Sequence, residues 1–167
     1  MRETPDRFVK VLEYNASGCF EDPAAVLTKV FAIGTYDEMV HVREIRVCTA
    51  CAHHGERILG KAHIAYIPKD HVVGLSKPAR MIDILCRRPQ IQENLSEQVV
   101  DIFQRTVQPY GCAVHLRAYH CCMIARGVWE PAAITETVAL RGCFKDNPAT
   151  RLEFLSSLDH SATTVWP

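Results

Sequence analysis

The chain has 167 residues, of which 48% are apolar and 23% are charged, and its formal net charge is zero. This balance is typical of a globular protein with a buried core, and it excludes an intrinsically disordered chain. A neutral chain has no general attraction for nucleic acid or an anionic membrane, so we expect neither as a partner. No apolar run reaches the ~18 residues of a membrane span, and we expect a cytoplasmic protein with reduced cysteines.

The first half of the chain predicts two helices and two strands. Apolar residues at helical spacing predict a helix over residues 5–16, and Asp-Pro at 22–23 would open a short helix that ends near residue 30. Residues 39–47 alternate in polarity with one change of phase, which predicts a strand with a bulge. Residues 60–67 alternate regularly and predict a second strand.

The second half begins with a predicted helix over residues 76–88, for which Ser76 is the expected N-cap. A stronger helical pattern covers residues 95–107. Strict alternation from residue 112 predicts a strand that continues to residue 122. Asn-Pro at 147–148 would cap a last helix, which carries apolar residues to about residue 158.

These elements predict an α+β fold with an antiparallel sheet and packed helices. The chain shows no internal repeat and no Gly/Ser-rich linker. We therefore expect one domain over residues 1–160, followed by a flexible tail over residues 161–167.

Cys51 and His54 are the first residues that suggest chemistry, because a Cys and a His three positions apart can chelate one metal ion from a tight turn. Such a short motif often occurs by coincidence, and His53 or His54 could equally be a hydrogen-bonded histidine under a loop. A third ligand is needed to favour a metal site over that alternative.

The run His120-Cys121-Cys122 offers that ligand. Strand parity places Cys122 on the same face as His120 and turns Cys121 away, so Cys122 is the preferred thiol. Three protein ligands would leave the fourth zinc position for water, as in catalytic zinc sites. We interpret the remaining cysteines as structural; they are Cys19, Cys48, Cys86, Cys112 and Cys143.

Longer motifs lie between and beyond these residues in the chain. They are GKAHIAYIP at 60–68, GLSK at 74–77 with Arg80, RPQIQE at 88–93, His120-x-Cys122 with RGV at 126–128, and RLEFL at 151–155. In this order they resemble the GTP cyclohydrolase I family, and the resemblance runs from Thr4 to about Leu158. It implies the tunnelling fold, in which subunit sheets join into a barrel. It also implies a ring-shaped homo-oligomer, expected to be a decamer, with active sites at subunit interfaces.

The resemblance also implies roles for individual residues. Zinc would be held by Cys51, His54 and Cys122, while His53, His120 and Ser76 would be catalytic. Glu93 and Gln92 would bind the guanine end of GTP. The triphosphate would lie among Arg7, Ser76, Lys77, Arg80 and Arg126.

Local chemistry supports part of this assignment, because Ser76 and Lys77 open a predicted helix whose N-terminus attracts anions, and Arg80 follows one turn later. Without the resemblance, Lys77 and Arg80 could be a solvated helix face, and Arg126 a surface charge. Arg87 and Arg88 are expected to be surface charges.

The implied reaction is hydrolysis of the purine imidazole ring at C8, which gives formate and 7,8-dihydroneopterin triphosphate. This chain departs from the family pattern near the metal ligands, where Ala52 replaces a glutamate and Gly55-Glu56-Arg57 replaces an apolar stretch. Glu136 also replaces an uncharged residue. Either Glu56 or Glu136 could restore the missing carboxylate.

Two alternatives follow from these departures. A divergent paralogue could hydrate or open GTP, or a related purine nucleotide, at C8 and stop at a different product, in secondary metabolism or nucleotide modification. A catalytically dead nucleotide-binding oligomer is a further alternative, which the intact metal ligands and His120 disfavour.

Overall fold

The structure is a computed structural model that describes residues 2–158, so the tail expected over residues 161–167 lies outside the described residues. Its helices are α1 (Thr4–Ala16), α2 (Ser76–Cys86), α3 (Gln92–Val107), α4 (Cys121–Ile124), α5 (Cys143–Asp146) and α6 (Pro148–Ser156), with 3₁₀ turns η1 (Ser17–Phe20) and η2 (Ala25–Thr28). Its strands are β1 (Val30–Ala32), β2 (Val40–Cys51), β3 (Arg57–Ile67), β4 (His71–Val73), β5 (Pro89–Gln90), β6 (Gly111–His120) and β7 (Thr135–Gly142).

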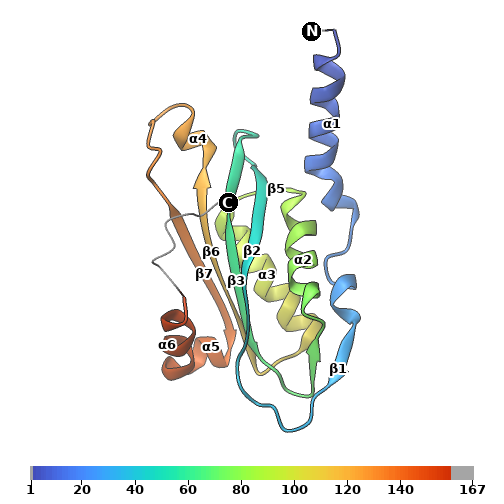
Figure 1. Ribbon diagram of the computed structural model, residues 1–167, viewed down its shortest axis with the longest axis vertical. Helices are drawn as coiled ribbons and strands as arrows, with labels where there is room; N and C mark the ends of the chain where they lie inside the picture. Colours follow the sequence, from blue (N-terminus) through green and yellow to red (C-terminus); the bar gives the residue numbers. More distant parts are fainter. Residues whose placement is uncertain (1, 159–167) are drawn as a thin grey trace.

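The main sheet has the strand order β5-β2-β3-β6-β7 (Figure 1). Its four long strands pair antiparallel, and only the two-residue β5 pairs parallel with β2. Alternation predicts three of the four long strands, and β7 was missed. Strands β1 and β4 form a separate two-stranded sheet. The α+β class and the antiparallel sheet are confirmed.

The predicted bulge in β2 is present, because the register with β3 shifts between Val42 and Ile45. Glu44 adopts a φ of 59° there, in the left-handed region that side chains rarely occupy. The extra residue turns the Glu44 carboxylate toward Lys61 and His63 of β3, at 3.1 and 3.4 Å.

Three predicted details are wrong. The helix expected to end near residue 30 is only the 3₁₀ turn η2, since the chain enters β1 at Val30. Ser76 is the first residue of α2 and not its N-cap, and no side chain caps that helix. The strand expected to continue to residue 122 ends at His120, because residues 121–124 form the short helix α4.

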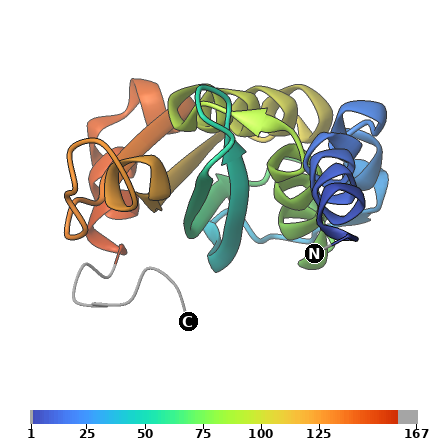
Figure 2. The same cartoon turned by 90° about the horizontal axis from the view of Figure 1, so that it is seen from above.

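One face of the main sheet packs against α2 and α3, and this is where the hydrophobic core lies (Figure 2). Alternate residues of β3 and β6, such as Ile64 and Val114, point into it and are fully buried. Helix α3 contributes Leu95, Val99 and Phe103, which follow the helical period and are at most 1% exposed. The alternation in the sequence therefore identified the core face correctly.

The opposite face carries polar residues that are nevertheless buried. His63 of β3 pairs directly opposite His115 of β6, with ring centroids 5.8 Å apart, and His41 of β2 lies 6.0 Å from His63. Phe154 of α6 packs edge-on against His41. Burial lowers the pKa of His63 to about 4, and Glu44 opposes that shift only in part.

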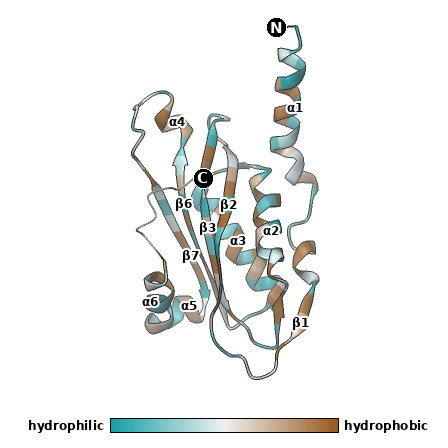
Figure 3. Cartoon of the chain, viewed as in Figure 1, coloured by the Kyte–Doolittle hydropathy of each residue, from teal (hydrophilic) through white to brown (hydrophobic). Residues whose placement is uncertain are grey.

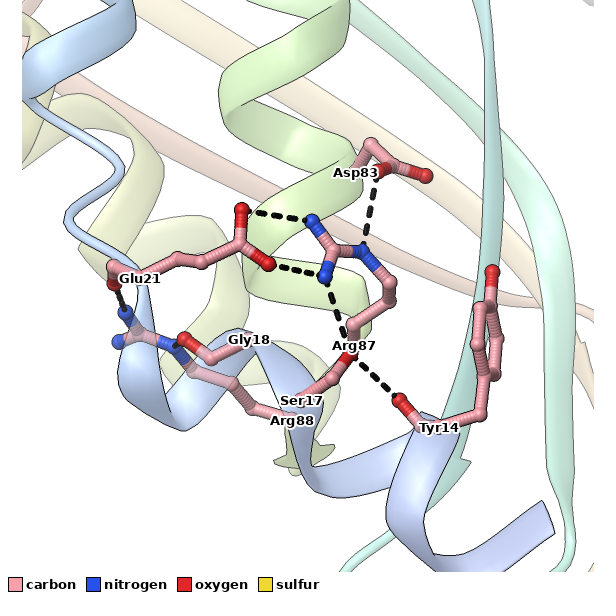
Figure 4. Close-up of polar contacts among 7 residues, drawn as sticks. All are labelled: Tyr14, Ser17, Gly18, Glu21, Asp83, Arg87 and Arg88. Carbon is pink, nitrogen blue, oxygen red and sulfur yellow. Dashed lines mark hydrogen bonds and ion pairs between the residues drawn. The ribbon is translucent and has the colours of Figure 1, made fainter. Parts of the chain in front are cut away.

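Two arginines attach the N-terminal segment to the end of α2 (Figure 4). Arg87 pairs with Glu21 and with Asp83, and also donates to the Ser17 hydroxyl. Arg88 donates to the backbone carbonyls of Gly18 and Glu21, both at 2.8 Å. The expectation that Arg87 and Arg88 are plain surface charges is therefore wrong, because both hold η1 in place.

Glycine at position 18 allows this close approach. The backbone N–H of Gly18 donates to Arg87 O at 2.9 Å, and a Cβ at this position would come within 2.1 Å of Ile84 O. Any side chain here would push η1 away from α2.

The lowered pKa of His63 predicts a pH dependence of stability. In the unfolded chain this imidazole takes up a proton near pH 6.5, whereas in the folded chain it does so only near pH 4. The unfolded state therefore binds more protons between these values, and stability is lost as the pH falls through that window. We expect the melting temperature to decrease from pH 6.5 to pH 4, and to decrease less in His63→Gln. His71→Gln, on β4, is the control; equal slopes for wild type and His63→Gln would contradict the account.

Candidate functional site

A tight turn between β2 and β3 brings His54 back over Cys51. The N–H groups of His54 and Gly55 both donate to Cys51 O, at 3.3 and 2.8 Å, and Gly55 has a φ of 70°. Cys51 N closes the turn by donating to Glu56 O at 2.7 Å. As a result Cys51 Sγ lies 3.8 Å from His54 Nδ1 and 3.9 Å from His53 Nδ1.

Cys122 reaches the same point from β6, one residue into α4. The ligand atoms of Cys51, His54 and Cys122 all lie within 4.8 Å of one another. Cys122 was preferred to Cys121 because the alternating pattern predicts a strand that continues to residue 122. The strand in fact ends at His120. The first turn of α4, and not strand parity, directs the Cys122 thiol.

This group of donors fits a zinc ion. Zinc prefers thiolate and imidazole ligands at about 2.3 and 2.0–2.1 Å, which in a tetrahedron places neighbouring ligand atoms roughly 3.5–3.8 Å apart. The Cys51–His54 pair already has that separation. Cys51 is buried, whereas His54 is exposed and Cys122 half-buried, so solvent reaches the centre of the group. Burial and the Cys51 thiol raise the pKa of Cys122, and Arg126 opposes them.

Strand β5 supports this turn from the other side. It pairs with Ala50 and Cys51 at the end of β2, and Ala52 N donates to Gln90 O at 2.8 Å. Thr49 Oγ1 donates to Arg88 O at 2.9 Å. No sequence pattern indicates this support, because a two-residue strand has no periodicity to detect.

His120 ends β6, two residues before Cys122 of the candidate metal group. Its Nε2 lies 2.8 Å from Gln92 Oε1, at the start of α3. Burial lowers the pKa of His120, and the neighbouring carboxylate of Glu93 opposes this shift. Glu93 itself is exposed in the first turn of α3.

The structure therefore gathers most of the expected site at one end of the sheet. These residues are Cys51, His53, His54, Gln92, Glu93, His120, Cys122 and Arg126.

The expected triphosphate residues do not join them within one chain. Ser76, Lys77 and Arg80 lie in the first turns of α2, whose last turn leads into β5 at the metal end. Eleven residues of helix span about 16 Å, so the two groups are separated by the length of α2. Arg7 lies on α1, where it is largely exposed and pairs with Glu3.

Glu136 does not supply a carboxylate to the metal end. Its oxygens lie 3.1 Å from His115 Nε2 and 3.0 Å from Arg117 Nε. Those partners belong to the sheet face opposite α2 and α3. The suggestion that Glu136 replaces the carboxylate missing at Ala52 is therefore wrong.

A solved structure of similar fold supports the architecture described above. The archaeosine synthase QueF-Like in its apo form superposes with a TM-score of 0.52 at 19% identity, covering 62% of this chain and 93% of that chain. The chain thus has the tunnelling fold, with a Cys₂His group at one end of its sheet.

Sequence relatives then define the family. The family model for GTP cyclohydrolase I matches residues 1–159. The chain is 43% identical over 153 residues to GTP cyclohydrolase 1 of Chlorobium chlorochromatii, covering 92% of this chain and 69% of the relative. It is also 43% identical over 157 residues to GTP cyclohydrolase 1 of Desulforamulus reducens, covering 93% and 83%. The chain belongs to the GTP cyclohydrolase I family.

Within residues 2–158, none of the helices combines the length and the apolar character needed to cross a lipid bilayer.

The geometry of the three ligands predicts zinc affinity. We expect added zinc to raise the melting temperature, since a ligand at 100 times its Kd stabilises by about 2.7 kcal/mol. Cys122→Ser should weaken zinc binding by more than the roughly 10- to 100-fold that outer-shell partners contribute. Cys121→Ser is the matched control, because this neighbouring thiol is not part of the group. Equal zinc affinity for the two variants, measured by competition with a chromogenic chelator, would exclude Cys122 as a ligand.

Proposed function

We propose that this protein uses zinc to hydrolyse the imidazole ring of GTP at C8, giving formate and 7,8-dihydroneopterin triphosphate. The observation that carries the proposal is the meeting of Cys51, His54 and Cys122 beside His120, in a chain of the GTP cyclohydrolase I family. The net reaction consumes one water per GTP and needs no oxidant or reductant. We further propose that the protein works in the cytoplasm.

Zinc, when bound by the three ligands, would supply Lewis-acid chemistry and lower the pKa of water at its open position. The chain's own residues would transfer protons and orient the guanine ring. His53 lies beside Cys51, and His120 ends β6 two residues before Cys122, so both are suited to act as acid and base at the ring nitrogens. The Glu93 carboxylate is exposed near His120, and would accept hydrogen bonds from N1–H and the 2-amino group of guanine.

The triphosphate would be bound by a neighbouring subunit. Ser76, Lys77 and Arg80 provide a helix N-terminus and two cations, but they lie at the far end of α2 from the metal ligands. A ring-shaped homo-oligomer, which we propose to be a decamer, would bring this group from one chain to the metal end of another. Ser76, a proposed catalytic residue, would be brought to the shared site together with this group.

Helix α1 supports an oligomer independently. None of its residues is buried within one chain, and Figure 3 shows hydrophobic residues along it where it extends away from the rest of the fold. Phe8 and Leu12 are 63% and 51% exposed. Apolar area of this kind is typical of a surface that another subunit covers.

The alanine at position 52 favours a second candidate function. A methyl group stands next to His53 where the family pattern has a carboxylate, and Glu136 is engaged elsewhere. A neighbouring negative charge favours imidazolium, so its loss would affect the proton-transfer steps that follow ring hydration. The alternative is therefore an enzyme that stops at a hydrated or ring-opened product of GTP or a related nucleotide.

Product analysis distinguishes the two candidates. We expect the zinc-loaded protein to release formate from GTP and to form a fluorescent pterin after oxidation, in equal amounts. Cys122→Ser should abolish both products, and Cys121→Ser should retain them. A ring-opened nucleotide without pterin, identified by mass spectrometry, would contradict full turnover and support the alternative.

Mixing of variants tests the shared site. Arg80→Ala and Cys122→Ser should each be nearly inactive, because each lacks one half of the site. After the two are unfolded and refolded together, about a quarter of the sites should combine an intact half from each chain. Cys51→Ser mixed with Cys122→Ser is the control and should stay inactive, because both changes affect the same half. Full activity of Arg80→Ala alone would show that the phosphate assignment is wrong.

A further inference from the structure

Gln92 is a buried side chain in direct contact with a proposed acid/base residue. It is 2% exposed at the first position of α3, and its Oε1 lies 2.8 Å from His120 Nε2. Its Nε2 faces three acceptors: Leu116 O at 3.3 Å, Thr135 O at 3.0 Å and Thr137 Oγ1 at 3.3 Å. These contacts come from β6 and β7, so the amide is surrounded by the fold.

The acceptors around the Gln92 side chain determine the orientation of its amide group. Leu116 O and Thr135 O are backbone carbonyls, which can only accept hydrogen bonds. The atom of Gln92 that faces them must therefore be the amide nitrogen, which donates to both. The carbonyl oxygen is left to face His120, and it can only accept.

This orientation determines where neutral His120 carries its proton. Because Gln92 Oε1 can only accept, His120 Nε2 must be the protonated nitrogen that donates to it. The lone pair of neutral His120 is then on Nδ1. A glutamine thus selects one tautomer of the imidazole and fixes the ring at the end of β6.

Other contacts keep Gln92 in this position. Ser96 Oγ donates to Gln92 O at 3.1 Å, one turn along α3, and lies 2.7 Å from Thr137 Oγ1. Thr137 therefore contacts both the amide of Gln92 and the hydroxyl of Ser96. The network connects α3, β6 and β7 immediately behind His120.

From this geometry we infer that Gln92 is a positioning residue that acts through His120 and does not bind substrate. Its oxygen is engaged by His120 and its nitrogen by the sheet, so neither end of the amide is available to guanine. The inference rests on the proposed function for the role of His120, and it replaces the substrate-binding role that the family resemblance suggests for Gln92. It makes Nδ1 the nitrogen through which neutral His120 accepts a proton.

Steady-state kinetics separate positioning from substrate binding. Gln92→Met keeps the length of the side chain but cannot accept from His120. We expect its kcat for GTP to fall on the order of 10- to 100-fold, as when an orienting partner or an acid/base group is impaired, with KM unchanged. Gln104→Met is the matched control, because Gln104 lies on the same helix and donates to Pro109 O at the other end of it. A rise in KM with unchanged kcat would overturn the inference, and so would wild-type kinetics.

A spectroscopic measurement tests the same point without turnover. In zinc-loaded protein labelled with ¹⁵N-histidine, the His120 ring, assigned by its loss in His120→Asn, should carry its proton on Nε2. Gln92→Met should give a mixture of tautomers, while Gln104→Met should match the wild type. A wild-type proton on Nδ1 would overturn the inference. Failure of the proposed function would instead appear as wild-type protein that releases no formate, whatever the tautomer.

Discussion

The site depends on the register of three strands. Ile58 of β3 pairs with Thr49 of β2 on one side and with His120 of β6 on the other. Cys51 lies two residues beyond Thr49, and Cys122 lies two residues beyond His120. The two thiols are therefore brought together at one end of the sheet by the hydrogen bonds of the strands. The β2–β3 turn adds His54, and a shift of one residue in either pairing would separate the ligands.

The helices complete this end of the sheet. Helix α3 begins there and presents Gln92 to His120 from its first position, with Glu93 next along the chain. Helix α2 ends there and continues into β5, which supports the turn of the metal ligands. The opposite end of α2 carries the cations expected to bind phosphate. In the proposed function, one chain would thus provide two separated halves of a site, and a ring of chains is the arrangement that would join them.

The sequence predicted the regular parts of the fold well, for physical reasons. Alternation in β3 and β6 and the helical period of α3 reflect burial on one face, which is the strongest local signal a sequence carries. The short elements β1, β4 and β5 were missed because two or three residues show no period. Arg87 and Arg88 were misjudged because their partners lie about 70 positions earlier in the chain.

The candidate site residues also divide into those that local sequence predicts and those that depend on distant parts of the chain. Cys51 and His54 could be found from their spacing, whereas Cys122 was selected through a strand that ends two residues before it. The burial of Gln92 and the engagement of Glu136 by His115 and Arg117 depend on strand pairing, which no single stretch of sequence reveals. Sequence motifs therefore selected the candidate residues, and the structure was needed to show which neighbours Gln92 and Glu136 contact.

The central claim is that two thiolates and one imidazole hold zinc and leave one position to solvent. X-ray absorption spectroscopy of the zinc-loaded protein tests it most directly. The account predicts two sulfur ligands at about 2.3 Å and two nitrogen or oxygen ligands at about 2.0–2.1 Å, one of which is exchangeable. A shell of four non-exchangeable protein ligands, or one without two sulfurs, would contradict it.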